Sequence, residues 1–158
     1  MPLDTLAPTS AVLARVVALC NEPEIFRWLF AARCGDRSYG PDDARGWLEG
    51  GATGWRAGDR FAFVALDGDG LPAAACDLQS ADPEPEIGFW CGAAHRGLGM
   101  PMVEALAGLA GEAGCAGLRA RVRPGNERSE ALLRRCGFAR TGSASGDFSL
   151  WHRPLAGG

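Results

Sequence analysis

The stretch His95–Pro101, which reads HRGLGMP, constrains the fold most, because it joins two segments of different periodicity. Before it, apolar and polar residues alternate over Glu86–Cys91, which predicts a strand with two unlike faces. After it, apolar residues recur over Val103–Ala113 at the spacing of one helix face. Gly97 and Gly99 give the backbone the freedom that a tight junction needs. The sequence therefore predicts a strand, a glycine turn and a helix in succession.

The segments around this unit change from a helical to an alternating apolar period at Arg60. Glycine, proline or capping residues bound most of them. They are predicted helices over Ser10–Leu19 with Ser10 as cap, over Glu24–Arg33 ended by Gly35, and over Pro41 to about Glu49, a hairpin of strands over 61–65 and 71–77, a strand over 118–122, a helix over 126–136, and strands over 138–143 and 147–152. This order predicts an α+β fold (mixed α/β), a mixed, mostly antiparallel sheet flanked by helices.

Composition excludes several classes of protein. A length of 158 residues suits one core, so we expect a single domain over residues 1–158. The net charge of −3 argues against nucleic acid and membrane surfaces as partners. The 6 cysteines lack Cys-x-x-Cys spacing and only 2 histidines accompany them, so neither a metal site nor a disulfide framework is expected. Without a secretion signal or an apolar run of about 18 residues, the chain is predicted to be cytoplasmic.

The glycine turn is also suited to binding a phosphate group. A helix that starts there presents unpaired backbone N–H groups and the positive end of its dipole. Arg96 adds a cation that can make a charge-assisted contact. Pro101 has no N–H, which costs a charged ligand one hydrogen bond worth about 1.5–3 kcal/mol. From these residues alone, a pyrophosphate site and a turn that binds nothing both stay open.

Three motifs between Glu86 and Thr141 resemble those of the GNAT superfamily of acyl-CoA N-acyltransferases. They are EIGFW at 86–90, HRGLGM at 95–100 and PGNERSEALLRRCGFARTG at 124–142. The family's pyrophosphate loop reads Arg/Gln-x-x-Gly-x-Gly/Ala, and Arg96–Pro101 fits it at all but the last place. The first motif and the Asn-x-x-Ser helix start are similar to the branch that acetylates N-termini of ribosomal proteins, whose members also acylate small amines and antibiotics. The resemblance implies a GNAT-like fold.

The resemblance also implies an activity and its partners. The expected enzyme transfers an acetyl group from acetyl-CoA, without a metal, to a primary amine on a small molecule or a peptide. Family members often dimerise through their last strands, so a homodimer is one implied assembly. The residues implied for binding acetyl-CoA are Cys91, Arg96, Gly97, Leu98, Gly99, Met100, Asn126 and Ser129.

Two residues are candidates for the proton transfers that amide formation requires. An ammonium must lose a proton before it attacks, and Glu86 is the expected base, directly or through water, with Glu84 and Asp82 as alternatives. Many family members protonate the departing thiolate with a tyrosine, but Leu133 stands at that position here. Ser129 is the expected substitute, and a purely capping role for it is the alternative. Asn126, at the start of the same helix, is expected to cap it.

Two other functions remain as alternatives. Pro101 and Leu133 leave open an acyl-CoA-binding module that has lost turnover. A dinucleotide-binding domain is disfavoured, because Arg119 and Arg121 stand where an acidic residue about 20 positions after the glycine loop is needed. Acyl transfer through a cysteine is also disfavoured, since neither Cys91 nor Cys136 has a visible histidine partner.

Further expectations concern the surroundings of the site. Loops after Gly50 and over 143–146 are expected to shape the acceptor pocket. Gly108 and Gly111 cost their helix about 1 kcal/mol each relative to alanine, which predicts close packing against another element. Four tryptophans are expected mostly in the core, with a wall of the acceptor pocket as the alternative. They are Trp28, Trp47, Trp55 and Trp90.

Overall fold

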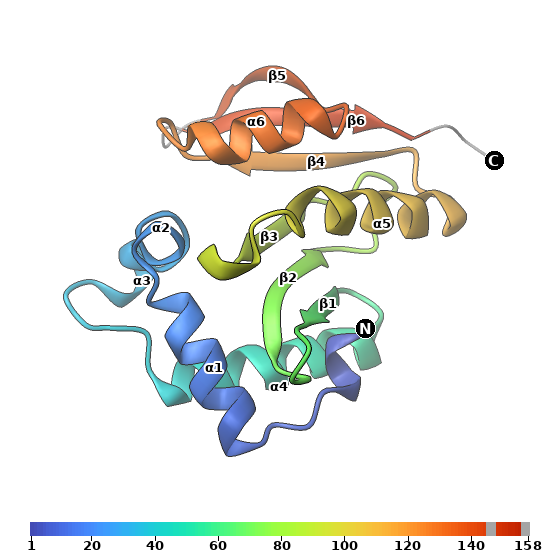
Figure 1. Cartoon of the computed structure of the whole chain (residues 1–158). Helices are drawn as coiled ribbons and strands as arrows, with labels where there is room; N and C mark the ends of the chain where they lie inside the picture. Colours follow the sequence, from blue (N-terminus) through green and yellow to red (C-terminus); the bar gives the residue numbers. More distant parts are fainter. Residues whose placement is uncertain (145–147, 156–158) are drawn as a thin grey trace.

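The computed structural model describes residues 1–144 and 148–155 of the chain (Figure 1). Its α-helices are α1 (Ser10–Cys20), α2 (Pro23–Ile25), α3 (Ala31–Cys34), α4 (Pro41–Ala57), α5 (Gly99–Glu112) and α6 (Glu127–Arg135). Its strands are β1 (Phe61–Leu66), β2 (Pro72–Leu78), β3 (Ile87–Cys91), β4 (Gly117–Val122), β5 (Ala139–Ala144) and β6 (Phe148–Pro154). Short 3₁₀ turns cover Leu3–Thr5 and Ala93–His95, and a π-helical segment, Phe26–Phe30, links α2 to α3.

The strands form two antiparallel sheets, and one edge strand of the first sheet lies beside one edge strand of the second. The first has the order β1-β2-β3 and the second the order β4-β6-β5. The facing edges belong to β3 and β4, which are joined by a parallel bridge between Glu86 and Arg119. Next to the bridge, Arg119 N donates to Pro85 O at 3.0 Å. The predicted fold, with mostly antiparallel strands flanked by helices, is confirmed.

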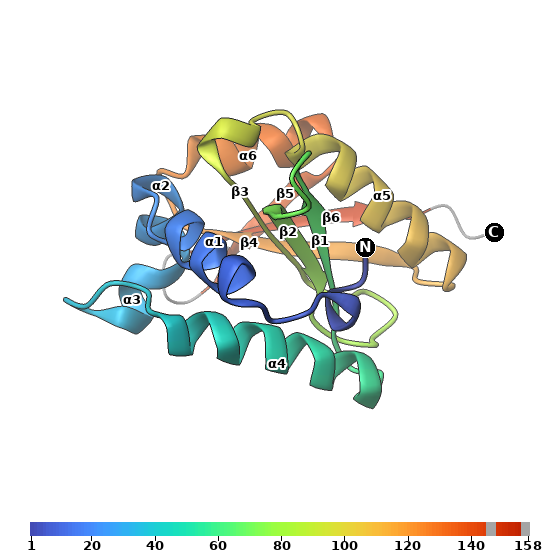
Figure 2. The ribbon, with the colours of Figure 1, turned by 60° about the horizontal axis from the view of Figure 1, so that its bottom comes forward.

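Helices cover both faces of the first sheet. α1 and α4 lie together on one face (Figure 2), and α5 packs on the other. Side chains of β2 alternate between these layers: Cys76 packs in the same cluster as Val103 of α5, whereas Ala75 packs with Leu19 of α1. Asp77 follows the alternation and shares the face of Ala75. A buried carboxylate therefore lies on the side that α1 and α4 cover.

The second predicted helix is interrupted. Instead of one α-helix over 24–33, a wider π-helical turn separates α2 from α3. A π-helical turn shifts the angular spacing of its side chains. Trp28 and Leu29, neighbours within this turn, both line the cavity described below. Gly35, with φ of 61°, ends α3 as predicted.

Two further helix limits differ from the prediction. α1 is capped by Thr9 rather than Ser10, because the Thr9 Oγ1 accepts a hydrogen bond from Val12 N at 3.2 Å. α4 continues to Ala57 instead of ending near Glu49, so the predicted loop after Gly50 is helical. In the described part of the chain, every helix is too short or too polar to cross a membrane.

Two glycines in the second half of α4 let the helix pack closely against its neighbours. A Cβ on Gly51 would collide with Leu3 Cδ2, and a Cβ on Gly54 would lie 2.8 Å from the carbonyl oxygen of Arg60. The opposite holds in α5, where a Cβ on Gly108 or Gly111 would meet no heavy atom within 4 Å. The close packing predicted at these two glycines is therefore wrong, since that side of α5 is open.

Candidate active site

The chain turns sharply between β3 and α5. His95 N donates to Gly92 O at 2.9 Å, and Leu98 N donates to His95 O at 3.2 Å. Gly97, directly before Leu98, has a φ of 118°, a conformation that strains residues with a side chain. A Cβ at Gly97 would have no neighbour within 4 Å, so backbone conformation, not crowding, requires the glycine.

The start of α5 exposes backbone donors. Met102 N is the first to bond within the helix, to Leu98 O at 3.0 Å. Gly99 and Met100 come before it, so their N–H groups have no partner inside the helix. Pro101, in the same turn, has no N–H to offer. Two backbone donors and the positive end of the helix dipole therefore point out of this turn.

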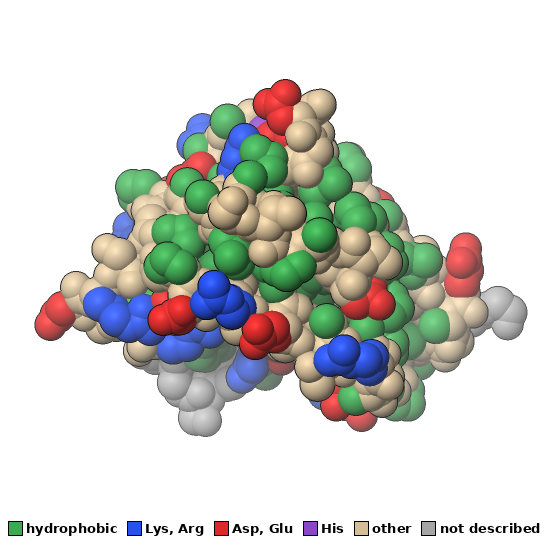
Figure 3. Space-filling model, turned by 90° about the horizontal axis from the view of Figure 1, so that it is seen from below, with side chains coloured by type: hydrophobic (Ala, Val, Ile, Leu, Met, Phe, Trp, Pro, Cys, Tyr) green, Lys and Arg blue, Asp and Glu red, His purple; other side chains and the backbone are tan. Residues whose placement is uncertain are grey.

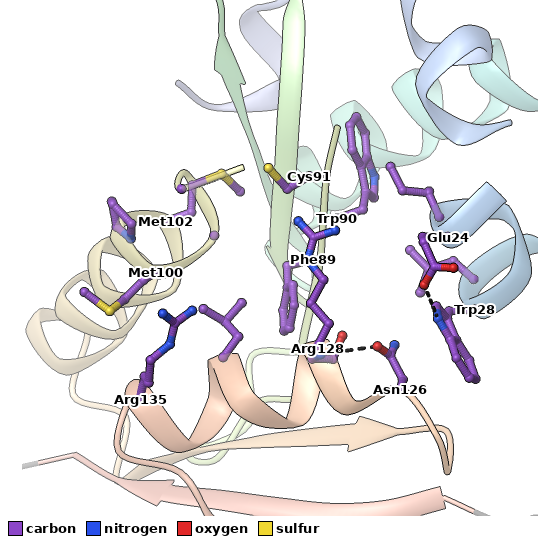
Figure 4. Close-up of a pocket in the computed structure, with 17 residues that line it drawn as sticks. Glu24, Trp28, Phe89, Trp90, Cys91, Met100, Met102, Asn126, Arg128 and Arg135 are labelled. Atoms are coloured by element: carbon purple, nitrogen blue, oxygen red, sulfur yellow. Dashed lines mark hydrogen bonds between the residues drawn. The ribbon is translucent and has the colours of Figure 1, made fainter. Parts of the chain in front are cut away.

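A cavity of about 350 Å³ lies beside this helix start and is called the turn cavity below (Figure 4). Its walls come from the end of β3, the start of α5, the inner side of α6 and the segment from α2 to Leu29. Arg128 and Arg135 of α6 line it, and within the described residues neither has a carboxylate within 4.0 Å. Arg128 extends from α6 toward the end of β3 (Figure 4). The cavity thus combines an apolar interior with two arginines that outnumber its one carboxylate, Glu24.

The start of α6 is fixed by its cap. Asn126 Oδ1 accepts a hydrogen bond from Ser129 N at 3.2 Å, which confirms the predicted capping role of Asn126. Both residues line the turn cavity. Leu133, one turn later, is fully buried in the core and does not line it. A side-chain hydroxyl on this wall therefore comes from Ser129.

The segment after α1 closes the opposite wall of the turn cavity. Trp28 Nε1 donates to Glu24 Oε2 at 3.2 Å (Figure 4). The Trp28 ring lies 3.6 Å from the position that a Cβ on Gly125 would take, just before α6. Glu22 Oε2 accepts from Ala93 N at 2.7 Å, which ties the segment to the turn after β3. The wall is therefore held from both sides of the cavity.

One side chain closes this segment at its base. Asn21 Nδ2 donates to the carbonyl oxygens of Val17 and Tyr39, each at 2.8 Å. Asn21 Oδ1 accepts from Tyr39 N at 3.0 Å. The side-chain amide of Asn21 therefore links the end of α1 to Tyr39, which lies just before α4.

A second cavity, of about 570 Å³, lies on the side of the first sheet that α4 covers and is called the α4 cavity below. It shares Leu29, Phe89 and Trp90 with the turn cavity, so the two cavities meet at the end of β3. Figure 3 views the molecule from this side and shows acidic and basic side chains gathered along one edge, with apolar side chains over much of the remainder.

An ion pair between a buried carboxylate and a half-exposed arginine lies in the α4 cavity. Arg60 donates through Nε to Asp77 Oδ2 at 2.8 Å, and through a terminal nitrogen to the same oxygen. Asp77 lies directly opposite Gly88 in the sheet, and a Cβ on Gly88 would sit 2.5 Å from Asp77 Oδ1. Gly88 therefore makes the room that the carboxylate occupies. The sequence analysis missed Asp77, although a single acid inside the apolar run before Leu78 was a usable signal.

The predicted bases lie elsewhere. Glu86 accepts from Arg121 Nε at 2.9 Å and lines a third, more open cavity beside the second sheet. Glu84 faces His152 Nε2 at 3.1 Å in that same cavity, and Asp82 lies 3.7 Å from Arg119, a more exposed pair. None of the three carboxylates lines the turn cavity or the α4 cavity.

The structure gathers most of the residues predicted to bind acetyl-CoA. Arg96 and Leu98 do not line the turn cavity, and Arg128 and Arg135, which the sequence analysis missed, supply its positive charge. Their spacing of seven residues on one helix, with Ser129 beside Arg128, was the available signal. Those that do line it are Cys91, Gly97, Gly99, Met100, Asn126 and Ser129.

Cys91 lies at the end of β3 and is not arranged as a nucleophile. Burial raises the pKa of its thiol. The Sγ atom donates to His95 O at 3.0 Å. Only the thiolate is strongly nucleophilic, so this thiol is held in its unreactive form.

Two other expectations concern absent or undescribed features. Over residues 1–144 and 148–155, no group of three or more His, Cys, Asp and Glu side chains is arranged to hold a metal ion. The predicted pocket loop over 143–146 falls partly outside the described residues.

Of the four tryptophans, Trp28 and Trp90 line the turn cavity, and Trp47 and Trp90 line the α4 cavity. Trp55 instead packs against Phe61 and donates to Ala62 O at 2.7 Å.

Comparison with known proteins gives a family and a set of similar folds. The model of the acetyltransferase (GNAT) domain family matches residues 5–139. No curated protein matches the sequence. Solved structures with a similar fold include a ribosomal-protein-S5-alanine acetyltransferase from Vibrio fischeri, with a TM-score of 0.76 and 17% identity over 95% of this chain and 90% of that one. Spermidine N-acetyltransferase from Vibrio cholerae, in complex with CoA and spermine, gives 0.74 and 13% over 94% and 93%. The N-acetyltransferase PseH from Campylobacter jejuni gives 0.69 and 13% over 99% and 96%.

Proposed function

The chain belongs to the GNAT acetyltransferase family, and from this premise we propose that it transfers an acetyl group from acetyl-CoA to a primary amine while both are bound. The amine nitrogen forms a bond to the acetyl carbon and the carbon–sulfur bond breaks. The ammonium proton goes to a base, and the CoA thiolate takes a proton. Catalysis rests on holding the two substrates in contact and deprotonating one of them.

The meeting of the two cavities at the end of β3 carries this proposal. The turn cavity has the donors and cations for a phosphate-bearing ligand, and the α4 cavity approaches from the other face of the same strand. Leu29, Phe89 and Trp90 form the wall that they share. Two ligands seated in these cavities would therefore meet beside Trp90, where β3 and β4 belong to different sheets.

The residues of the turn cavity fit acetyl-CoA. The N–H groups of Gly99 and Met100 would bind pyrophosphate oxygens, and Arg128 and Arg135 would neutralise phosphate charge. These two cations compensate for the donor that Pro101 lacks. Asn126 and Ser129 would lie along the pantetheine arm, and acetyl-CoA supplies the activated acetyl group.

Glu86 and Ser129 are the proposed proton acceptor and donor. Because Glu86 lines neither cavity and is paired with Arg121, it would receive the proton through water. Ser129 lines the turn cavity and would protonate or orient the departing sulfur. Asp77 is one of three carboxylates that line the α4 cavity, and it lies opposite Gly88 of β3, where it can attract the ammonium group.

Family membership favours catalysis over an acyl-CoA-binding module without turnover. Leu133 was one reason to consider that alternative, but its side chain points into the core and a hydroxyl is present one turn earlier. We also propose a location in the reducing cytoplasm, supported by 6 cysteines with free thiols. The homodimer implied by the resemblance stays a prediction.

The decisive experiment measures binding and turnover together. At 100 times its dissociation constant, acetyl-CoA should stabilise the protein by about 2.7 kcal/mol, raising Tm by several degrees, while ATP and NAD should have little effect. Release of CoA with a panel of amines then tests transfer. Glu86→Gln should lower kcat strongly and leave the Kd of acetyl-CoA unchanged, and Glu84→Gln tests the alternative base in the same assay. Stabilisation without transfer to any amine would favour the binding module.

A further inference from the structure

Three arginines and three aspartates line the α4 cavity, but they do not all pair with one another. Each of its three carboxylates has an arginine partner. One of those partners, Arg45, lies outside the cavity. One of the three arginines that do line the cavity is therefore left without a carboxylate partner there. The remaining cation is Arg33, which within the described residues has no carboxylate within 4.0 Å. The pairs are Asp42 with Arg45, Asp43 with Arg37 and Asp77 with Arg60.

Asp43, which lines the same cavity as Arg33, is already paired with another arginine. Its two oxygens accept from Arg37 at 2.5 and 2.9 Å, and Oδ2 also accepts from Gly40 N at 2.8 Å. The Arg37 guanidinium holds the pKa of the Asp43 carboxyl well below its usual range, so this carboxylate stays charged and bound to Arg37. Arg33 therefore keeps its charge available.

Aromatic rings hold Arg33 in place. Its Cζ lies 5.4 Å from the ring centre of Phe30 and 5.8 Å from that of Tyr39. Tyr39 is almost fully buried, and burial raises the pKa of its hydroxyl, so the ring carries no competing negative charge. Arg33 is exposed on its other side, and a guanidinium has enough N–H donors to bind a planar oxyanion there while it lies beside these rings.

Aromatic rings form part of the remaining wall of the α4 cavity. Trp47 and Trp90 lie with their ring centres 5.7 Å apart, and Phe89 completes the side that faces the turn cavity. A volume of about 570 Å³ is within the range of sites for small molecules. The cavity therefore offers an apolar body, a reaction end at Trp90 and a cation at Arg33.

We infer that the acceptor is a small amine that also carries an oxyanion, a carboxylate or a phosphate, which Arg33 binds. This inference rests on the proposed function, since it names the class of amine that this enzyme acetylates. The amine end would reach the shared wall at Trp90, and the apolar part would lie against the aromatic rings. A guanidinium binds carboxylate and phosphate in the same two-pronged geometry, so either anion satisfies the site. Polyamines would be disfavoured, because they bring further positive charge to an unpaired cation.

Matched pairs of amines test this inference. Each pair differs only in the anion: phenylalanine and phenylalaninamide, 4-(2-aminoethyl)benzoic acid and its carboxamide, and tyramine phosphate and tyramine, with spermidine as the polycation. We expect kcat/KM to be at least about tenfold higher for the anionic member of one or more pairs. The first two pairs report on carboxylate and the third on phosphate.

Variants then assign the preference to Arg33. Arg33→Gln should raise KM for the anionic amines and bring each pair within about threefold, while Arg33→Lys should keep part of the preference. Arg56→Gln is the matched control, because Arg56 is an exposed arginine that lies outside the three cavities and bonds to Thr53. A loss of fold in Arg33→Gln would lower kcat/KM for both members of a pair, which the ratio separates from a loss of selectivity.

The outcomes distinguish this inference from the proposed function. Acetylation without preference for any anionic member, or a preference that persists in Arg33→Gln, overturns the inference and leaves the proposed function intact. Acetyl-CoA that neither binds nor transfers its acetyl group overturns both. A preference that is lost only in Arg33→Gln supports both.

Discussion

The turn cavity and the α4 cavity share a wall but are built in different ways. The turn cavity is centred on backbone, a positive φ at Gly97 and the free N–H groups at the start of α5, to which Arg128 and Arg135 add positive charge. The α4 cavity depends on side chains that come from α3, α4, β1 and β2, with Asp77 and Arg33 as its defining charges. A backbone site serves any ligand with the same phosphate group, whereas a side-chain site can change its ligand by substitution. This difference suits an enzyme whose turn cavity always binds the same substrate and whose α4 cavity binds an amine that varies between enzymes.

The largest expected effect breaks the turn cavity alone. Gly97→Ala places a side chain at φ of 118°, which costs about 1–3 kcal/mol of strain or moves the turn. Because the same turn presents the N–H groups of Gly99 and Met100, we expect the Kd of acetyl-CoA to rise about 10- to 100-fold. Calorimetric titration measures this, and KM for the amine should change little.

Gly114→Ala is the matched control for that variant. Gly114 also has a positive φ, 83°, and open space around a Cβ, but it lies beyond the other end of α5. It should lower Tm without changing the Kd of acetyl-CoA. Equal changes in Kd for the two variants would mean that the turn acts through stability alone.

The next effect breaks the α4 cavity alone. Gly88→Ala puts a Cβ 2.5 Å from Asp77 Oδ1, so the carboxylate and its partner Arg60 must move. We expect a loss of about 1–3 kcal/mol in stability and a fall in kcat/KM for the amine, with an unchanged Kd for acetyl-CoA. Urea unfolding and steady-state kinetics measure the two.

Gly50→Ala serves as the control for Gly88→Ala. Gly50 lies in α4, and a Cβ there would meet nothing within 4 Å, so this variant should gain about 0.5–1 kcal/mol of stability. A loss of acetyl-CoA binding in Gly88→Ala would contradict the separation of the two cavities.

The smallest effect concerns pH and the ion pair behind the α4 cavity. Arg37 holds the pKa of Asp43 well below its usual range, so the carboxylate stabilises the fold above the unfolded pKa of about 3.9. That stabilisation is lost as pH falls toward the folded pKa. Asp43→Asn should therefore lower Tm by a few degrees at pH 7 and by less at pH 2.

Asp42→Asn isolates this effect. Asp42 is its neighbour in the first turn of α4, is fully exposed and pairs with Arg45. Its Tm should differ little from that of the parent at either pH. A difference between Asp43→Asn and the parent that is as large at pH 2 as at pH 7 would show that shape, not charge, matters at this position.

The same contrast explains what the sequence could predict. The glycine turn, the cap at Asn126 and the following helix are local patterns, so their chemistry can be read within about ten residues. The role of Asp77 depends on its register with Gly88 and on Arg60, 17 residues before it, and no local pattern specifies either. The continuation of α4 past Gly50 was missed for a similar reason, since Gly51 is favourable only because Leu3 packs against it.

Asn21 has a consequence for how such an enzyme evolves. Its amide joins the end of α1 to Tyr39, so residues 22–38 form an excursion with fixed ends. This excursion carries Trp28, which lines the turn cavity, Arg33, which lines the α4 cavity, and Leu29, which lines both. Insertions, deletions or exchanges within it would be absorbed between the two anchored ends, with the sheet and the glycine turn left in place. A lineage could thus inherit the transfer machinery unchanged and acquire a new acceptor by replacing one short interval of its gene.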